Sequence, residues 1–97
     1  MRIVDQRTIK IVKGKHQEEV ERFNSRVLEF DGFIKRELLL NIDNPEYDLL
    51  LVQMHWESKD KLLAFKKSDL HREGHKNRQP NPNIIEHKMQ LFTLENK

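Results

Sequence analysis

The sequence predicts a small α+β domain, and three observations support this prediction. The chain has 97 residues, which is the length of one domain. Apolar residues alternate along four of its segments, as in strands, and recur every three or four residues along two others, as in amphipathic helices. These segments follow one another as β-α-β-β-α-β, which is the order of a ferredoxin-like split βαβ domain. We therefore expect residues 1–97 to form a single ferredoxin-like domain.

The first half of the chain is expected to form a strand, a helix and a second strand. Residues 2–12 predict the first strand, because their apolar side chains alternate, and Gly14 then ends it. Residues 16–30 predict an amphipathic helix that is ended by Asp31-Gly32. The apolar residues of this helix are Val20, Phe23, Val27 and Phe30. A second strand should then run from Phe33 to Leu40.

The second half is expected to form a hairpin strand, a helical region and a last strand. Turn-forming residues at 41–46 precede a strand from Tyr47 to Trp56, which predicts an antiparallel hairpin. Ser58 is a predicted N-cap for a helix that contains Phe65. Ser68 is a second predicted cap, followed by a short helix that contains His71 and His75. Residues 78–83 predict a loop, and the last strand should run from about Ile85 to Leu94.

The two-sided apolar pattern of the later strands predicts a homodimer. Leu49 and Leu51 fall on one face of their strand, whereas Leu50 and Val52 fall on the other. Two helices can cover only one face of a four-stranded sheet, so the second face needs a partner. We expect two copies to pack sheet against sheet as a dimeric α+β barrel.

Composition excludes several classes of protein. The chain has no cysteine, which removes disulfides and thiolate metal sites and fits a cytoplasmic protein. The first residues lack the apolar region of a signal peptide, and no apolar run is long enough to span a membrane. The net charge of +2 is compatible with an acidic ligand and requires neither nucleic acid nor membrane.

Two histidines with helical spacing are the first candidates for chemistry. His71 and His75 lie four residues apart, which suits a metal site, although the sequence offers no third ligand and a solvated pair is the simpler interpretation. A haem iron needs only one proximal histidine. Lys76 and Arg78 follow His75, and cations at these positions can pair with haem propionates. On spacing alone, a histidine near a helix terminus remains the preferred interpretation.

Three groups of residues resemble a known family. Trp56-Glu57-Ser58-Lys59 is similar to the strand-to-helix entry of the antibiotic biosynthesis monooxygenase superfamily. Phe65-Lys66-Lys67-Ser68-Asp69, with His75 ten residues after Phe65, resembles the haem-degrading, IsdG-like branch. Gln6-Arg7 and Lys13-Gly14 resemble the first strand of that branch and the turn that follows it. The resemblance extends from Arg2 to Leu94 and is most specific over residues 56–75.

The resemblance implies an enzyme that uses haem as both cofactor and substrate, with O₂ and electrons from an external reductase. It implies that His75 ligates the haem iron, with Lys76 and Arg78 nearby as haem-binding residues. Gln6 stands where the family has an asparagine, and Phe65 where it has a tryptophan, so the implied catalytic set is Gln6, Phe65 and His75. Gln6 keeps an amide group and Phe65 keeps a large ring. These departures imply that haem binding survives while ring cleavage is slowed, altered or lost.

Other functions stay open at this point. A haem-independent oxygenase acting on a quinol or a polyketide-like aromatic is the enzymatic alternative, and a non-catalytic haem-binding or sensing protein is another. Taken alone, Phe65 fits a core aromatic on an amphipathic helix. No flavin or nicotinamide motif is present. RNA-binding domains share the order of elements, but the strand from Tyr47 lacks their RNP1 pattern, so no nucleic-acid partner is expected.

Overall fold

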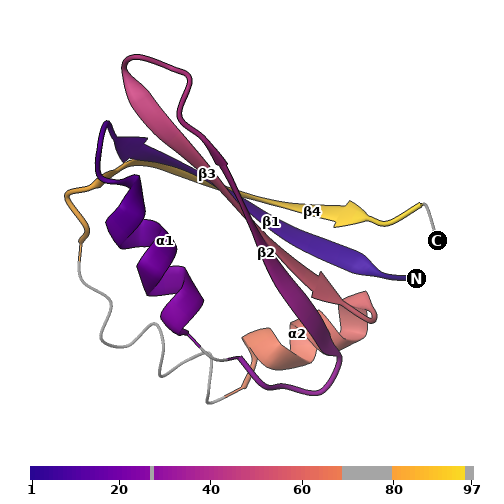
Figure 1. The fold of residues 1–97 in the computed structure, drawn as a ribbon. Helices are drawn as coiled ribbons and strands as arrows, with labels where there is room; N and C mark the ends of the chain where they lie inside the picture. The colour runs from indigo at the N-terminus through magenta and orange to yellow at the C-terminus, as the bar shows by residue number, and fades with distance from the viewer. Residues whose placement is uncertain (27, 69–79, 96–97) are drawn as a thin grey trace.

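The computed structural model has the predicted order of elements (Figure 1). It describes residues 1–26, 28–68 and 80–95. The elements are β1 (Ile3–Val12), α1 (His16–Ser25), β2 (Phe33–Asn41), β3 (Tyr47–Trp56), α2 (Lys59–Lys66) and β4 (Ile84–Thr93). The limits of the strands agree with the prediction to within one residue, and the ferredoxin-like fold is confirmed.

The four strands form one antiparallel sheet in the order β2-β3-β1-β4. β1 is a central strand that pairs with β3 on one side and with β4 on the other. β2 and β3 form the expected hairpin. Because side chains alternate between the two faces of a strand, the register of β1 decides which residues of its neighbours share a face.

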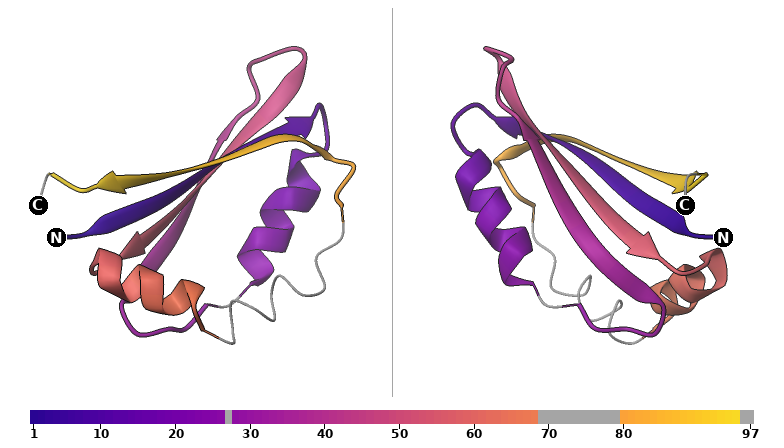
Figure 2. Two further views of the ribbon diagram at one scale, coloured as in Figure 1. Left: turned by 180° about the vertical axis from the view of Figure 1, so that it is seen from behind. Right: turned by 45° about the vertical axis from the view of Figure 1, so that its right-hand side comes forward.

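Both helices lie on the same face of the sheet (Figure 2). The core beneath α1 contains Ile9 and Ile11 from β1 with Leu50 and Val52 from β3, and all four side chains are buried. Val20 and Phe23 of α1 are among the residues that pack against this core. Odd-numbered residues of β1 up to Ile11 and even-numbered residues of β3 therefore face the helices.

The first helix is shorter than predicted. α1 ends at Ser25, and the expectation that it continues to Phe30 is wrong. The Arg36 guanidinium on β2 donates hydrogen bonds to the carbonyls of Phe23 and Arg26, so acceptors at the end of the helix are satisfied from the sheet. Phe30 instead packs its ring against Trp56, with ring centroids 6.2 Å apart. Packing against α2 and β3 therefore outweighs the helical periodicity of this segment.

A glycine is required where the chain enters β2. Gly32 is buried and has φ +90°, a conformation that side chains disfavour. A Cβ atom at this position would lie 2.4 Å from Cβ of Lys61 on α2. The Gly32 carbonyl also accepts a hydrogen bond from the Glu57 amide at 2.8 Å. Gly32 thus lets the start of β2 pass directly beneath α2.

The second helix begins as predicted. The Ser58 hydroxyl accepts a hydrogen bond from the Lys61 amide at 3.3 Å, which confirms Ser58 as the N-cap of α2. The short helix predicted after Ser68, with His71 and His75, falls at residues 69–79 and lies outside the described residues. No helix in the described part of the chain combines the length and apolar content that a membrane span needs.

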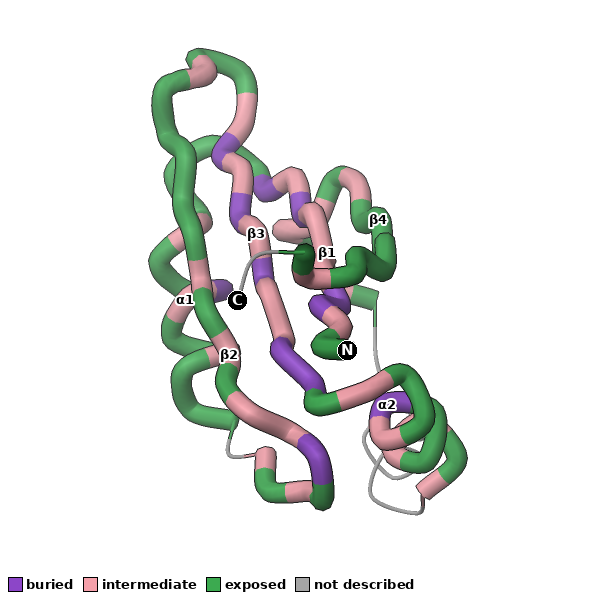
Figure 3. The backbone as a smooth tube through the Cα atoms, turned by 90° about the vertical axis from the view of Figure 1, so that its right-hand side faces the viewer, coloured by how far each residue is buried: buried purple, intermediate pink, exposed green. Residues whose placement is uncertain are grey.

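The face of the sheet away from the helices is only partly covered by the chain itself. Leu39 and Phe92 on this face are each 45% exposed, and Leu49 and Leu51 are half-buried. Figure 3 shows that the edge strands β2 and β4 are mostly exposed, whereas β1 and β3 hold most of the buried positions. The predicted two-sided apolar pattern is therefore present in the folded chain.

A buried carboxylate joins the two loops at one end of the sheet. The side chain of Asp48 lies 2.9 Å from the Lys13 ammonium, 2.9 Å from the Gly14 amide nitrogen and 2.8 Å from Nδ1 of His16. The Lys13 ammonium also donates to two carbonyls in the 42–44 turn. The Lys13 ammonium, with the donors from His16 and Gly14, lowers the pKa of Asp48 to about 2 from its ordinary value of 3.8.

We predict that Asp48→Asn lowers the free energy of unfolding by about 1–3 kcal/mol, because the three donors lose the charge of their buried acceptor. The folded-state pKa of Asp48 lies below its ordinary value of 3.8, so its stabilisation is present above that value and is lost as the pH falls toward about 2. Urea unfolding between pH 2 and pH 7 measures both effects. Asp43→Asn, at an exposed turn position, is the control and should change little. Equal stability of the two variants at pH 7 would contradict this role.

Candidate functional site

The helix-facing surface of the sheet has aromatic side chains at the end beneath α2. Trp56, at the end of β3, is fully buried. The ring centroid of Phe65 on α2 lies 5.2 Å from that of Trp56 and 5.2 Å from that of Phe30. Phe33 on β2 lies 5.3 Å from Trp56. These four rings, which we call the aromatic cluster, attach α2 to the sheet. The predicted site residue Phe65 is therefore in contact with the core.

A charged pair lies between the two ends of this surface. Asp5 and Arg7 are odd-numbered residues of β1, so they share the helix-facing side with Ile9. Asp5 is 1% exposed. Its Oδ2 lies 3.9 Å from Nη2 of Arg7, which is too long for a hydrogen bond. Within the described residues, Oδ1 of Asp5 and Nε of Arg7 are buried and have no hydrogen-bond partner.

Apolar side chains on β4 border this pair. Met89 is the register partner of Arg7, and Leu91 is the partner of Asp5. Met89 is 49% exposed and Leu91 is 41% exposed. We call Asp5, Arg7, Met89 and Leu91 the central band. It presents unpaired polar atoms beside exposed apolar surface, the combination expected of a ligand site.

The structure does not bring Gln6 and Phe65 together. Gln6 lies between Asp5 and Arg7 in β1, so its side chain is on the face opposite the helices. There it accepts a hydrogen bond from Nε2 of its register partner Gln53 at 2.8 Å. A period of two counted back from the core residue Ile9 reaches Arg7 and Asp5. That signal was available in the sequence, and it identifies the two polar residues that the resemblance missed.

The remaining predicted site residues, His75, Lys76 and Arg78, lie outside the described residues. Within residues 1–26, 28–68 and 80–95, no three His, Asp or Glu side chains gather as they would around a metal ion. The roles assigned to these three residues therefore stay predictions.

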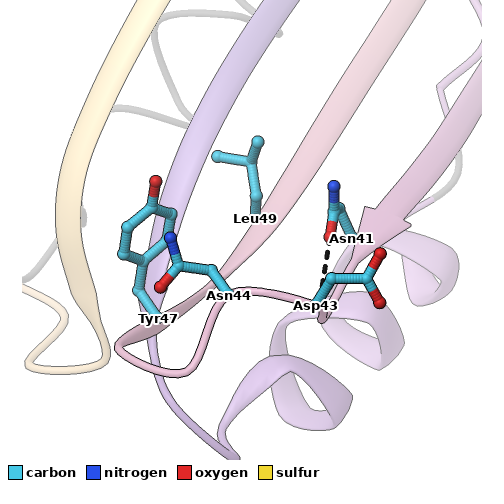
Figure 4. Close-up of a pocket in the computed structure, with 5 residues that line it drawn as sticks. All are labelled: Asn41, Asp43, Asn44, Tyr47 and Leu49. Atoms are coloured by element: carbon cyan, nitrogen blue, oxygen red, sulfur yellow. Dashed lines mark hydrogen bonds between the residues drawn. The ribbon is translucent and has the colours of Figure 1, made fainter.

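A separate hollow lies at the β2–β3 hairpin (Figure 4). It has a volume of about 330 Å³ and is lined by Asn41, Asp43, Asn44, Tyr47 and Leu49. The Asn41 side chain accepts a hydrogen bond from the Asp43 backbone amide, which shapes the turn. Neither Gln6 nor Phe65 lines this hollow, and Tyr47 and Leu49 lie on the face of β3 away from the helices.

The fold and the central band define a ferredoxin-like α+β protein with a candidate ligand surface beneath its helices. The chain belongs to the antibiotic biosynthesis monooxygenase family, whose model matches residues 2–77. It is 31% identical to a heme-degrading monooxygenase of Halalkalibacterium halodurans over 90 residues, covering 91% of this chain and 78% of the relative. The family resemblance inferred from the sequence is confirmed.

Solved structures share the fold. A crystal structure from Bacillus cereus, named for antibiotic biosynthesis monooxygenase, superposes with a TM-score of 0.86 at 20% identity, covering 99% of this chain and 95% of the other. The heme-degrader MhuD of Mycobacterium tuberculosis, solved with two hemes in its active site, superposes with a TM-score of 0.76 at 23% identity. That match covers 98% of this chain and 97% of MhuD.

We predict that Phe65→Ala lowers the free energy of unfolding by about 2–3 kcal/mol, because the ring is half-buried and contacts two aromatic neighbours. Leu63→Ala is the matched control on the same helix, since its side chain is 39% exposed, and it should cost less than about 1 kcal/mol. Chemical denaturation followed by circular dichroism measures both variants. Equal losses would show that the aromatic cluster does not hold α2 in place.

Proposed function

We propose that this protein is a haem-degrading monooxygenase. The observation that carries the proposal is the 31% identity to a relative named heme-degrading monooxygenase over 91% of the chain. The central band supports it, because a haem edge needs apolar surface such as Met89 and Leu91, together with cations for its carboxylates. Haem is then the substrate as well as the cofactor, and an external reductase supplies the electrons.

Within this proposal, His75 is the protein ligand of the haem iron, and Lys76 and Arg78 pair with the haem propionates. Bound haem supplies the iron centre at which O₂ reacts. The chain supplies orientation and protection from water. The ring of Phe65, held against Trp56 and Phe30, forms an apolar wall at the α2 end of the helix-facing surface.

In this proposal Gln6 does not contact the ligand, because its side chain lies on the other face of the sheet. The polar group that β1 offers to a ligand beneath the helices is the Arg7 guanidinium, whose side chain is 18% exposed. A cation in this position differs from the amide that the resemblance implies. Because of this cation and the phenyl ring of Phe65, we propose that the chain binds haem but cleaves the macrocycle more slowly or in an altered way.

We predict that hemin binds the wild-type chain, one per subunit, and produces a Soret band. His75→Ala should shift the Soret maximum and weaken binding by at least tenfold, because the variant lacks the imidazole that would hold the haem iron. An absorbance titration measures both. His71→Ala is the matched control and should bind as wild type does. An unchanged maximum and affinity in His75→Ala would show that another residue is the ligand.

Addition of ascorbate to the hemin complex tests catalysis separately from binding. We expect the Soret absorbance to decay under air and to persist under nitrogen, because cleavage of the macrocycle needs O₂. A stable spectrum under air would favour a non-catalytic haem-binding protein. Absence of any Soret band would favour the haem-independent oxygenase.

We also propose that the face of the sheet away from the helices joins two copies of the chain. Leu39 and Phe92 lie exposed on this face, and the hydrogen-bonded Gln6–Gln53 pair lies between the strands that carry them. Burial of this apolar surface favours association. The result would be the dimeric α+β barrel expected from the sequence.

We predict that Leu39→Asp produces a monomer, because a carboxylate would be buried between the two sheets. Light scattering after size exclusion measures the mass. Leu63→Asp places the same charge at a comparably exposed leucine on α2 and should leave the dimer intact. A dimeric Leu39→Asp variant would place the interface elsewhere.

A further inference from the structure

The central band contains charges whose buried atoms have no partner inside the described chain. The Asp5 carboxylate is buried beside Arg7, Met89 and Leu91, and only one of its oxygens approaches Arg7. Burial of an ionised group without hydrogen bonds costs free energy. Asp5 lies 3.9 Å away, so the guanidinium has no close acceptor among the residues that the structure describes. The pair therefore fits a site that is completed by a ligand.

A second cation lies beside the first. Nζ of Lys66 on α2 is 3.9 Å from Sδ of Met89, and Met89 is the register partner of Arg7. Two cations from different elements therefore border the same methionine side chain. Lys66 is partly buried, and no carboxylate of the described residues lies within ion-pair distance of it.

Five of the other described lysines do have such partners, and Lys15, Lys59 and Lys67, which have none, are exposed, whereas Lys66 is half-buried. The paired lysines are Lys10 with Glu86, Lys13 with Asp48, Lys35 with Glu37, Lys61 with Asp31 and Lys88 with Glu86. Lys66 differs from them in facing an apolar side chain on the helix-facing side of the sheet. With one carboxylate for two cations, the group of Asp5, Arg7 and Lys66 has a formal charge of +1. Electrostatics here favour an anionic ligand group.

We propose that Arg7 and Lys66 bind a carboxylate of the ligand, and that Asp5 is a positioning residue for the Arg7 guanidinium. Met89 and Leu91 would contact the apolar body of the same ligand. The inference rests on the proposed function, so the carboxylate is one of the two haem propionates, and Lys76 and Arg78 would pair with the other. An arginine suits this task because its planar fork matches a carboxylate, and a partly desolvated ion pair is stronger than an exposed one.

The test compares hemin with hemin dimethyl ester, which has the same macrocycle without the two carboxylates. Absorbance titrations of the full chain give the affinity of each variant for both ligands. Arg7→Gln and Lys66→Gln should each weaken hemin binding about tenfold and leave the affinity for the ester unchanged. Asp5→Asn should reduce the ratio of the affinity for hemin to the affinity for the ester. If Asp5 had a purely structural role, this ratio would stay constant.

Lys88→Gln is the control, since this lysine lies on the other face of the sheet with its side chain 68% exposed, and both affinities should stay as in wild type. Lys66 is on a helix surface, so its variant tests the proposal even where Asp5→Asn fails to fold. The proposal that Arg7 and Lys66 bind the carboxylate would be overturned if these variants lost equal affinity for hemin and for the ester. It would also be overturned if both variants kept the wild-type affinity for hemin. A wild-type chain that binds no hemin would reject the haem proposal itself, and with it the ligand of this pair.

Discussion

The pairing of β1 with both β3 and β4 is the constraint on which the rest of the structure depends. Because β1 is central, its alternation assigns one set of residues to the helices and the other to the opposite face. Ile9 and Ile11 anchor this assignment, since both are buried in the core beneath α1. A shift of one residue would exchange Arg7 for Gln6 beneath the helices and expose the core, so the register defines the fold and the site together.

The two helices cover opposite ends of the helix-facing side of the sheet. α1 covers the aliphatic core at one end, and α2 is held at the other end by the rings of Trp56 and Phe65. Arg36 ends α1 early, and Gly32 lets the chain pass closely beneath α2. The central band lies between these two ends. Its unsatisfied polar atoms reduce stability, and such local costs are typical of surfaces kept for a ligand.

Family membership and the site of this chain are separate conclusions. The match over residues 2–77 establishes the family. The side chains beneath the helices differ from those that the resemblance implies. They include the phenyl ring of Phe65 and, on β1, Arg7 with the buried Asp5. An arginine–aspartate pair offers charge where an amide would offer a neutral hydrogen bond. The proposed haem chemistry therefore depends on residues that a fold comparison alone does not assess.

The sequence alone determined the order of elements, the hairpin, the cap at Ser58 and the family resemblance, because these depend on local periodicity and on short motifs. It did not determine where α1 ends, since the Arg36 guanidinium and the Trp56 ring that packs against Phe30 belong to other elements. The resemblance implied Gln6 as the polar site residue of β1, whereas the structure has the Gln6 side chain on the other face and Arg7 beneath the helices. One residue of register separates the two faces of a strand, and only the packing of β1 between β3 and β4 beneath the helices decides which face meets a ligand.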